Sequence, residues 1–362
     1  MKTYCKHLVV SRKDILHAYI TWRGSRAGKK NHWRVIEEYG NARHLVNQIY
    51  RELIDRKLCF RPIKIIHRRE GTHSKVRRIG IESVKQQICE YVILTKLHDL
   101  YEDKLGFYQC AGVKGKGTLF AVKALKRYIS KAPETAYYVK GDIRKCYEST
   151  RHSVVKNLYA KYTTSSDLLY IIDCLLYANE MANGKPVGLN LGGAFSLFTM
   201  NLLLSQAYHH IDNMGKRRRD KWVRPVIFQL WYMDDYFILS KTKSQAIYVA
   251  KQIEKYLKDQ LGMTVKPWHA EPVSTPIDMC GFVVSKDKVI VRDRIFKHAR
   301  KAYKRFRLYP NITTARPICS YYGYLKHADT EKYMERNDIR ALTNKANEIV
   351  SICENYSIPI GG

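Results

Sequence analysis

Apolar residues recur at helical spacing in several parts of the chain. After Asn41, a residue type that often caps helix N-termini, they fall at Leu45, Ile49 and Leu53 and share one face. The same spacing, or a capping pattern before it, predicts the remaining helices: after Ser11, after Ser83, up to Tyr162, around DLLYIIDCLLYA, over 244–261 and through most of the chain from residue 292 onward. The chain is therefore expected to be rich in helices with one buried face.

Other apolar runs alternate with polar residues or are bounded by turn residues, which predicts β-structure. The run TAYYVKGDI is expected to form a buried strand that ends at Asp142. Three further segments predict pairs of strands: the basic ribbon FRPIKIIHRREGTHSKVRRIGI, the apolar hairpin PVIFQLWYMDDYFILS and the hairpin MCGFVVSKDKVIV. Because strands and helices are mixed without a regular βαβ alternation, we expect an α+β fold.

The composition adds size and charge to this picture. The chain has 362 residues, of which 45% are hydrophobic, enough for one multi-lobed domain or two domains with a large core. It carries 64 Lys and Arg against 33 Asp and Glu, a net charge of +31, which indicates a polyanionic partner such as nucleic acid. A membrane surface is the weaker interpretation, because no single amphipathic basic helix holds this charge.

Two features bear on the cellular compartment. The nine cysteines are scattered, without the close pairs of a zinc site, which is typical of free thiols in a reducing cytoplasm. The N-terminal segment has no apolar stretch long enough for a signal peptide. The uncharged run over 186–211 has the length of a membrane span, but it contains Asn190, Asn201 and Ser205, so we expect a buried loop and helix instead. We therefore expect a cytoplasmic protein without a membrane partner.

Two adjacent acids, Asp234 and Asp235, interrupt the apolar stretch LWYMDDYFIL. A tight turn could hold them in solvent, because Asp is a common turn residue. The apolar and aromatic flanks favour burial instead, where adjacent like charges are unfavourable unless a cation neutralises them. Asp142 is a third acid at a predicted strand end. Because two Mg²⁺ ions about 4 Å apart on such carboxylates can promote phosphoryl transfer, we expect a nucleotidyltransferase.

The residues around these acids resemble motifs of the reverse transcriptases. YMDD at 232–235 is similar to the YxDD box of that family, and VKGDIRKCYESTRHSVV is similar to its first palm motif. The resemblance implies that Asp142, Asp234 and Asp235 are catalytic and bind two Mg²⁺ ions, with Mn²⁺ as an alternative.

Further segments extend the resemblance over nearly the whole chain. GLNLGGAFS is similar to the glycine loop that contacts nucleotide and template, KVRRIGIESVKQQICEYVI to a fingers segment, and MCGFVV to the primer grip. The resemblance implies a right-hand polymerase fold with an antiparallel palm sheet. Its fingers and palm would occupy residues 1–290, and a helical thumb with the C-terminal segment would occupy 291–362.

The resemblance also implies roles for individual residues. Tyr147 would lie beneath the incoming sugar and exclude a 2′-hydroxyl, so that dNTPs are favoured. The other implied nucleotide-binding residues are Arg77, Arg78, Ile143, Leu191, Gly192 and Lys266. The implied primer grip includes Gly281 and Phe282, and the implied nucleic-acid-binding residues of the thumb are Arg292, Arg294, Lys297, Arg300, Lys301 and Lys304. Without the resemblance, these cations would be explained as solvated basic faces, and Tyr147 as a core residue.

Within the family, the chain is most similar to two bacterial or phage-encoded groups, the reverse transcriptases of diversity-generating retroelements and those of antiphage defence. Asn190 stands where the glycine loop of the first group usually has Pro, and Leu191 stands where high-fidelity enzymes have Gln. A branched apolar side chain cannot form the hydrogen bonds of Gln. Relaxed base selection is therefore the hypothesis for this loop.

We therefore expect an RNA-directed DNA polymerase that extends a 3′-hydroxyl with dNTPs, copies a dedicated noncoding RNA and acts in bacterial antiphage defence. Three alternatives stay open: error-prone cDNA synthesis in a diversity-generating retroelement, RNA-templated RNA synthesis, and a non-catalytic RNA-binding protein on the same fold. The expected partners are the noncoding RNA template, the DNA product, dNTPs and either a protein partner or a second copy of the chain.

Overall fold

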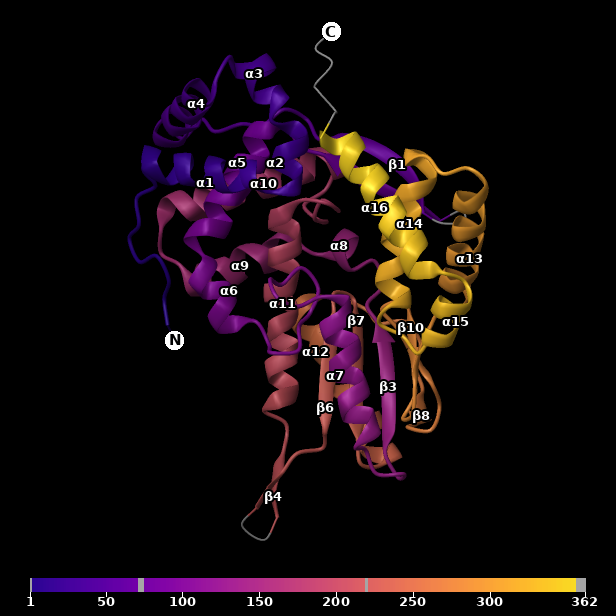
Figure 1. Ribbon diagram of the computed structural model, residues 1–362. Helices are drawn as coiled ribbons and strands as arrows, with labels where there is room; N and C mark the ends of the chain where they lie inside the picture. Colours follow the sequence, from indigo (N-terminus) through magenta and orange to yellow (C-terminus); the bar gives the residue numbers. More distant parts are fainter. Residues whose placement is uncertain (1, 71–74, 219–220, 356–362) are drawn as a thin grey trace.

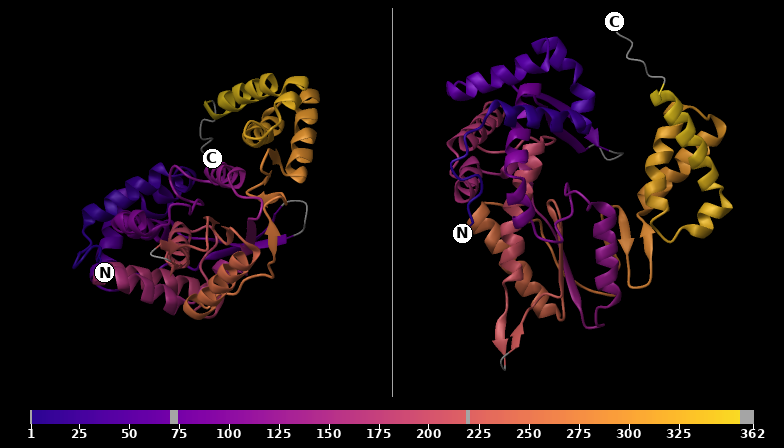
Figure 2. Two further views of the ribbon diagram at one scale, coloured as in Figure 1. Left: turned by 90° about the horizontal axis from the view of Figure 1, so that it is seen from below. Right: turned by 60° about the vertical axis from the view of Figure 1, so that its left-hand side comes forward.

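The computed structural model describes residues 2–70, 75–218 and 221–355. One group of helices lies above a four-stranded sheet, and the C-terminal helices form a second group to one side of both (Figures 1 and 2). All paired strands within the sheets are antiparallel, and helices are mixed among them. This architecture agrees with the α+β class that the sequence predicts.

The first group of helices begins where the sequence signals place it. The Ser11 side chain accepts the Asp14 N–H, and the Asp14 carboxylate accepts the Ser11 N–H, so the predicted capping box is formed. Asn41 and Ser83 cap the helices that follow them. The group comprises α1 (Arg12–Gly24), α2 (Arg26–Asn31), α3 (Trp33–Tyr39), α4 (Ala42–Ile54), α5 (Val84–Lys96), α6 (His98–Lys104), α8 (Cys146–Ser149), α9 (His152–Tyr162) and α10 (Ser166–Asn183). Helix α11 (Ala194–Asp212) belongs to it as well and continues down beside the sheet (Figure 1).

A basic ribbon of two strands extends from this group, as predicted. Strand β1 (Lys64–Glu70) pairs with β2 (Lys75–Ile81), and the register runs from Lys64 opposite Ile81 to Glu70 opposite Lys75. Figure 1 shows the ribbon reaching towards the C-terminal helices. The ribbon thus carries Arg77 and Arg78 on its second strand.

The central sheet has the strand order β6 (Phe228–Tyr232), β7 (Asp235–Ser240), β3 (Tyr137–Asp142) and β8 (Ala270–Pro272). Side chains on β7 alternate between two cores, as the two-residue period of a strand requires. Tyr236 and Ile238 pack into the core that includes the first helix group, whereas Phe237 and Leu239 pack into the core that includes the C-terminal helices. Helices α12 (Lys243–Leu261) and α7 (Thr118–Ser130) contact the sheet. Burial on both faces explains the continuous apolar sequence of these strands.

A second, smaller sheet leads to the C-terminal helices. Its order is β11 (Val289–Val291), β10 (Phe282–Val284) and β9 (Ile277–Met279), so the predicted hairpin is present with one additional strand. The helices that follow are α13 (Asp293–Leu308), α14 (Ile312–Leu325), α15 (Glu331–Arg336) and α16 (Ile339–Asn355). A short hairpin that the sequence pattern did not predict, β4 (Lys216–Arg218) with β5 (Lys221–Val223), projects at the end of α11 (Figure 1).

The uncharged run forms a loop and helix α11, in the core of the protein as predicted. Asn201 of α11 is buried, and its amide nitrogen donates to the Ala111 carbonyl oxygen at 2.9 Å. Gln109 in turn donates to the Asn201 carbonyl oxygen at 2.8 Å. Across the described ranges, each helix is too short or too polar to cross a membrane.

Candidate active site

The sheet register brings the three predicted carboxylates to one place. Asp142, the last residue of β3, lies opposite Asp235, the first residue of β7. The Ile143 N–H donates to the Asp234 carbonyl oxygen at 2.9 Å, which fixes the turn between β6 and β7 against the end of β3. In that turn Met233 has a φ of 55°, a left-handed conformation that is strained for a side chain of this size. The tight turn therefore places both of its acids beside Asp142.

The environment of the turn disfavours ionised carboxylates. Burial is the main cause that raises the pKa of both Asp234 and Asp235, and the neighbouring Asp142 raises both further. The positive charge of Lys140 lowers the pKa of Asp235 in part, and that of Arg77 lowers the pKa of Asp234 in part. Because ionised carboxylates are disfavoured here and the neighbouring cations offset this only in part, a bound cation would stabilise the ionised form of both acids.

Asp142 differs from the other two acids because it has a cationic partner. Its Oδ2 accepts a hydrogen bond from Lys266 Nζ at 2.6 Å, and its carbonyl oxygen accepts the Lys266 N–H at 2.9 Å. Within the described ranges, no three His, Cys, Asp or Glu side chains are grouped closely enough to hold a metal ion. The oxygen donors themselves are of the type that Mg²⁺ prefers. The three carboxylates thus supply suitable donor atoms, but in this arrangement Asp142 is paired with Lys266 and the three side chains do not form a closed metal cluster.

The carboxylates face a cavity of about 740 Å³. Strand β2, the end of β3, helix α8 and the glycine loop before α11 supply its walls. Most of the predicted nucleotide-binding residues line it: Arg77, Arg78, Ile143, Tyr147, Leu191 and Lys266. Gly192 follows directly in the loop, with a φ of 111° that favours glycine. Segments far apart in the sequence therefore converge on one polar and basic cavity.

Tyr147 borders this cavity from α8 and is partly buried. Its hydroxyl donates to Met233 Sδ at 3.5 Å, and burial raises its pKa, so the phenol is neutral. The Leu189 N–H donates to the Tyr147 carbonyl oxygen at 2.9 Å, which joins α8 to the glycine loop. Tyr147 is thus joined to the turn with the two acids through its hydroxyl and to the glycine loop through its backbone carbonyl.

The two predicted arginines have different surroundings. Arg78 donates to Asn183 Oδ1 at 2.5 Å and to the Ala182 carbonyl oxygen at 2.7 Å, so the end of α10 engages its guanidinium. Arg77 instead lowers the pKa of Asp234 through its charge. Arg77 is therefore the arginine that acts electrostatically on the acid turn, a distinction that the sequence did not reveal.

Of the predicted primer-grip residues, Gly281 lies in the turn from β9 to β10 and Phe282 is the first residue of β10. Gly281 has a φ of 86°, and a Cβ there would lie 2.7 Å from the Tyr324 ring, so close packing requires glycine. The Phe282 side chain is fully buried, with its ring 5.4 Å from that of Tyr324. Phe282 therefore supports the turn from the core, and its side chain is not accessible to a primer.

Helix α13 presents the predicted thumb cations. Arg294, Lys297, Arg300, Lys301 and Lys304 are exposed. Arg292 precedes the helix and donates from Nε to Asp278 Oδ1 at 2.7 Å. The exposed face is thus suited to a polyanion, whereas Arg292 fixes the helix to the smaller sheet.

Two residues near the site, Lys140 and Thr118, were not predicted from the sequence. Lys140, two residues before Asp142 and hence on the same face of β3, donates to the Asp278 carbonyl oxygen at 2.7 Å and acts on Asp235. The period of the strand could have identified it. Thr118, at the start of α7, forms a hydrogen bond of 3.0 Å with the Tyr232 hydroxyl, and no sequence signal predicts that contact.

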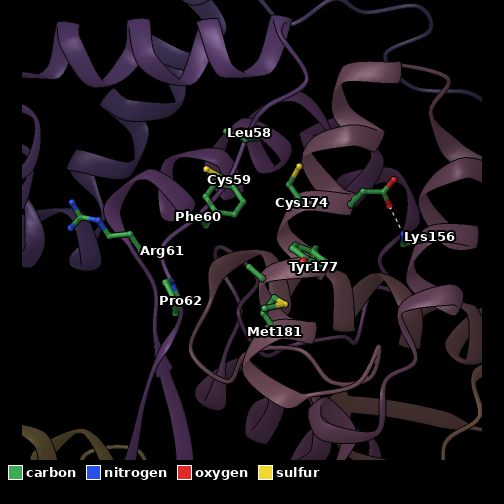
Figure 3. A pocket seen from close by; sticks show the side chains of 11 residues that line it. Leu58, Cys59, Phe60, Arg61, Pro62, Lys156, Cys174, Tyr177 and Met181 are labelled. Atoms are coloured by element: carbon green, nitrogen blue, oxygen red, sulfur yellow. Dashed lines mark ion pairs between the residues drawn. The ribbon is translucent and has the colours of Figure 1, made fainter.

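A second cavity, of about 470 Å³, has a lining that includes none of the three carboxylates. Figure 3 shows this lining. The segment 58–62 forms one side, and Cys174, Tyr177 and Met181 of α10 form the other. An ion pair of 2.9 Å between Lys156 and Asp173 lies at its edge (Figure 3). It contains none of the residues that the sequence analysis assigned to the active site.

A family profile described as reverse transcriptase (RNA-dependent DNA polymerase) matches residues 66–284, more than half of the chain. The match includes all but the first two residues of the ribbon, the glycine loop, all three carboxylates and the β9–β10 turn. No curated protein matches the chain. Members of this family have a right-hand polymerase fold, generally use divalent metal ions and make DNA from dNTPs on an RNA template. The chain belongs to the reverse transcriptase family, and it is an RNA-directed DNA polymerase, a nucleotidyltransferase.

Proposed function

We propose that Asp142, Asp234 and Asp235 hold two Mg²⁺ ions and form the catalytic centre of this polymerase. The observation that carries the proposal is the register of β3 and β7, which sets Asp142 opposite Asp235 at the edge of the large cavity. The raised pKa values of Asp234 and Asp235 support it, because a buried acid cluster with few internal partners favours cations.

The chain's own residues prepare this centre. When bound, two Mg²⁺ ions would lower the pKa of the primer 3′-hydroxyl and stabilise the pyrophosphate leaving group, and Mn²⁺ could replace them. Lys266 shields the Asp142 charge in their absence. Released from Asp142, its ammonium would remain close enough to bind the triphosphate.

The cavity walls are proposed to select the nucleotide. Tyr147 would place its ring beneath the sugar and exclude a 2′-hydroxyl. Arg77 would bind the triphosphate in bidentate fashion, for which a guanidinium is well suited. Leu191 and Gly192 would contact the base pair from the glycine loop. Arg78 has its strongest contacts with α10, so we assign it a supporting role in the position of the ribbon.

The rest of the fold is proposed to hold the primer and template. Residues 1–290 would form fingers and palm, and residues 291–362 the thumb and C-terminal segment. The β9–β10 turn at Gly281 would support the primer end. The exposed cations of α13 would follow the phosphate backbone of the duplex, so we expect the affinity for primer–template to fall steeply with salt.

We propose that the template is a dedicated noncoding RNA and that the protein acts in antiphage defence. The net charge of +31 supports a large RNA partner, and the altered glycine loop supports a specialised template. A specific observation favours a second role, error-prone synthesis in a diversity-generating retroelement: the apolar Leu191 borders the nucleotide cavity. A protein partner or a second copy of the chain could complete either system.

The test uses purified protein, an RNA template with an annealed DNA primer, Mg²⁺ and dNTPs. We expect DNA synthesis by the natural protein and none by the Asp234→Asn, Asp235→Asn double variant. Equal synthesis by both would refute the catalytic assignment. For the biological role, RNA that co-purifies with the protein and the DNA product are sequenced together. Repetitive DNA of fixed composition supports defence, whereas errors concentrated at template adenines support the retroelement.

A further inference from the structure

One asparagine side chain joins two walls of the nucleotide cavity. Asn190 Oδ1 accepts the Gly80 N–H at 3.0 Å, and Asn190 Nδ2 donates to the Gly80 carbonyl oxygen at 3.1 Å. Gly80 belongs to β2, two residues beyond Arg78, and Asn190 directly precedes Leu191. The Asn190 side-chain amide thus forms hydrogen bonds with both backbone polar groups of Gly80, as a residue on a neighbouring strand would.

Two buried glutamates hold this asparagine in place. Asn190 Nδ2 also donates to Glu82 Oε1 at 2.6 Å. Glu82 is hydrogen-bonded to Glu90, and Glu90 Oε2 accepts the Ala194 N–H at 3.0 Å at the start of α11. Because two carboxyl groups can form a hydrogen bond only when one carries a proton, the pair shares one negative charge at most.

The packing leaves no space for other side chains at two positions. A Cβ on Gly193 would lie 2.6 Å from Glu82 Oε1 and 3.0 Å from Glu90 Oε1. A Cβ on Gly80 would collide with Asn190 Oδ1. The nearest lysine on the same helix, Lys85, donates to Glu52 at 2.8 Å. The three polar side chains therefore satisfy one another and the adjacent backbone.

We propose that Asn190, Glu82 and Glu90 form a positioning clamp that sets the distance between the basic ribbon and the glycine loop, and thereby the affinity for the incoming dNTP. The inference rests on the proposed function of this cavity as the dNTP site. The catalytic carboxylates lie on the central sheet, outside the clamp. Loss of the clamp therefore weakens nucleotide binding while leaving the chemical step intact, because the walls that contact the dNTP lose their fixed spacing.

The test measures the KM for dTTP and kcat on poly(rA) primed with oligo(dT). We expect Asn190→Ala to raise the KM for dTTP by about tenfold with kcat unchanged, because the side-chain hydrogen bonds that join the glycine loop to the ribbon are lost. The matched control is Asn179→Ala. Asn179 is also a buried asparagine, but its Nδ2 donates to Leu175 within α10, so we expect lower stability and an unaltered KM.

Glu82→Gln provides the conservative rescue. Glutamine keeps an acceptor for Asn190 and supplies an N–H for Glu90, so we expect the KM to stay close to that of the natural protein, whereas Glu82→Ala raises it. In the double variant Asn190→Ala, Glu82→Ala the two effects are expected not to add, because both substitutions break the same clamp.

Several results would overturn the clamp. These are an unchanged KM in soluble Asn190→Ala protein, an equal rise in Asn179→Ala, or strict additivity in the double variant. If Asn190→Ala does not fold, the isosteric Asn190→Asp takes its place, because it loses both donated hydrogen bonds; an unaltered KM would then refute the proposal. A parallel assay of the Asp234→Asn, Asp235→Asn protein separates the two claims, since full activity there contradicts the catalytic site and not the clamp.

Discussion

The molecule contains two clusters of acids in buried surroundings, and they are stabilised in opposite ways. Glu82 and Glu90 share a proton, accept hydrogen bonds from Asn190 and a helix N-terminus, and need no further partner. Asp234 and Asp235 are also raised in pKa by burial, but the described charges around them neutralise them only in part, and they border a cavity. A completed hydrogen-bond set is thus typical of an acid pair that supports structure, whereas an incomplete set beside a cavity favours ligand binding.

The largest expected effect is the loss of primer extension when Asp234 and Asp235 are both replaced, without a loss of stability. Asp234→Asn with Asp235→Asn removes two of the three proposed metal ligands, so primer extension should fall by roughly a thousandfold or more, the several kcal/mol that bound metal ions supply to phosphoryl transfer. The same change removes charge repulsion, so the free energy of unfolding measured without metal should rise. A less stable double variant would contradict the comparison.

The glutamate pair should show the reverse stability effect. Glu90→Ala leaves the Ala194 N–H and the Glu82 carboxyl group without their partner, so the free energy of unfolding should fall by about 2 kcal/mol, the cost of an unsatisfied buried group. Urea titration followed by circular dichroism measures it. Glu37→Ala, at an exposed position of α3, is the control that should change little. A neutral effect of Glu90→Ala would show that the pair is not structural.

Lys266 sharpens the description of the aspartate cluster. Lys266→Met frees Asp142, so the Mg²⁺ concentration for half-maximal DNA synthesis should fall by about threefold, as expected for a partly exposed ion pair. The KM for dNTPs should rise in the same variant if the ammonium binds the triphosphate. The control is Lys145→Met. Lys145 borders the same cavity and pairs with Glu148, so its substitution removes the same charge without breaking a contact to Asp142. An equal shift in this control would mean that only net charge matters.

The smallest effect concerns pH. The pKa of Glu82 and that of Glu90 are both raised in the folded protein, mainly by burial, so the folded state keeps a proton that the unfolded chain releases. The contribution of the pair to the free energy of unfolding is fully present at pH values below the ordinary pKa of glutamate, and it is lost as pH rises through the raised pKa. The free energy of unfolding should therefore decline with rising pH, and less steeply for Glu82→Gln. Parallel slopes for the two proteins would contradict a shared proton.

The sequence predicted local structure well and side-chain partnerships poorly. The cap at Ser11, the basic ribbon and the hairpin around Asp234 were confirmed, because short-range spacing determines them. The resemblance to reverse transcriptases also indicated that Asp142 belongs with the hairpin acids, and the strand register agrees.

Long-range contacts explain what could not be predicted. Asn190 and Glu82 are 108 residues apart, and no local sequence pattern around either residue predicts their contact. Phe282 has a sequence position typical of the primer grip, yet tertiary packing places its ring in the core. Arg77 and Arg78 are adjacent in sequence, but strand geometry sends neighbouring side chains to opposite faces, so only the folded chain distinguishes their roles.

Binding of Mn²⁺, followed by electron paramagnetic resonance in the presence of primer–template and a non-hydrolysable dNTP analogue, shows directly whether Asp142, Asp234 and Asp235 bind metal ions. We predict two bound ions in the natural protein and clear loss of binding in the Asp234→Asn, Asp235→Asn variant. The Glu82→Gln variant should bind as the natural protein does, because its acid pair is satisfied internally. Unchanged Mn²⁺ binding in the aspartate variant would contradict the assignment of these acids as the metal site.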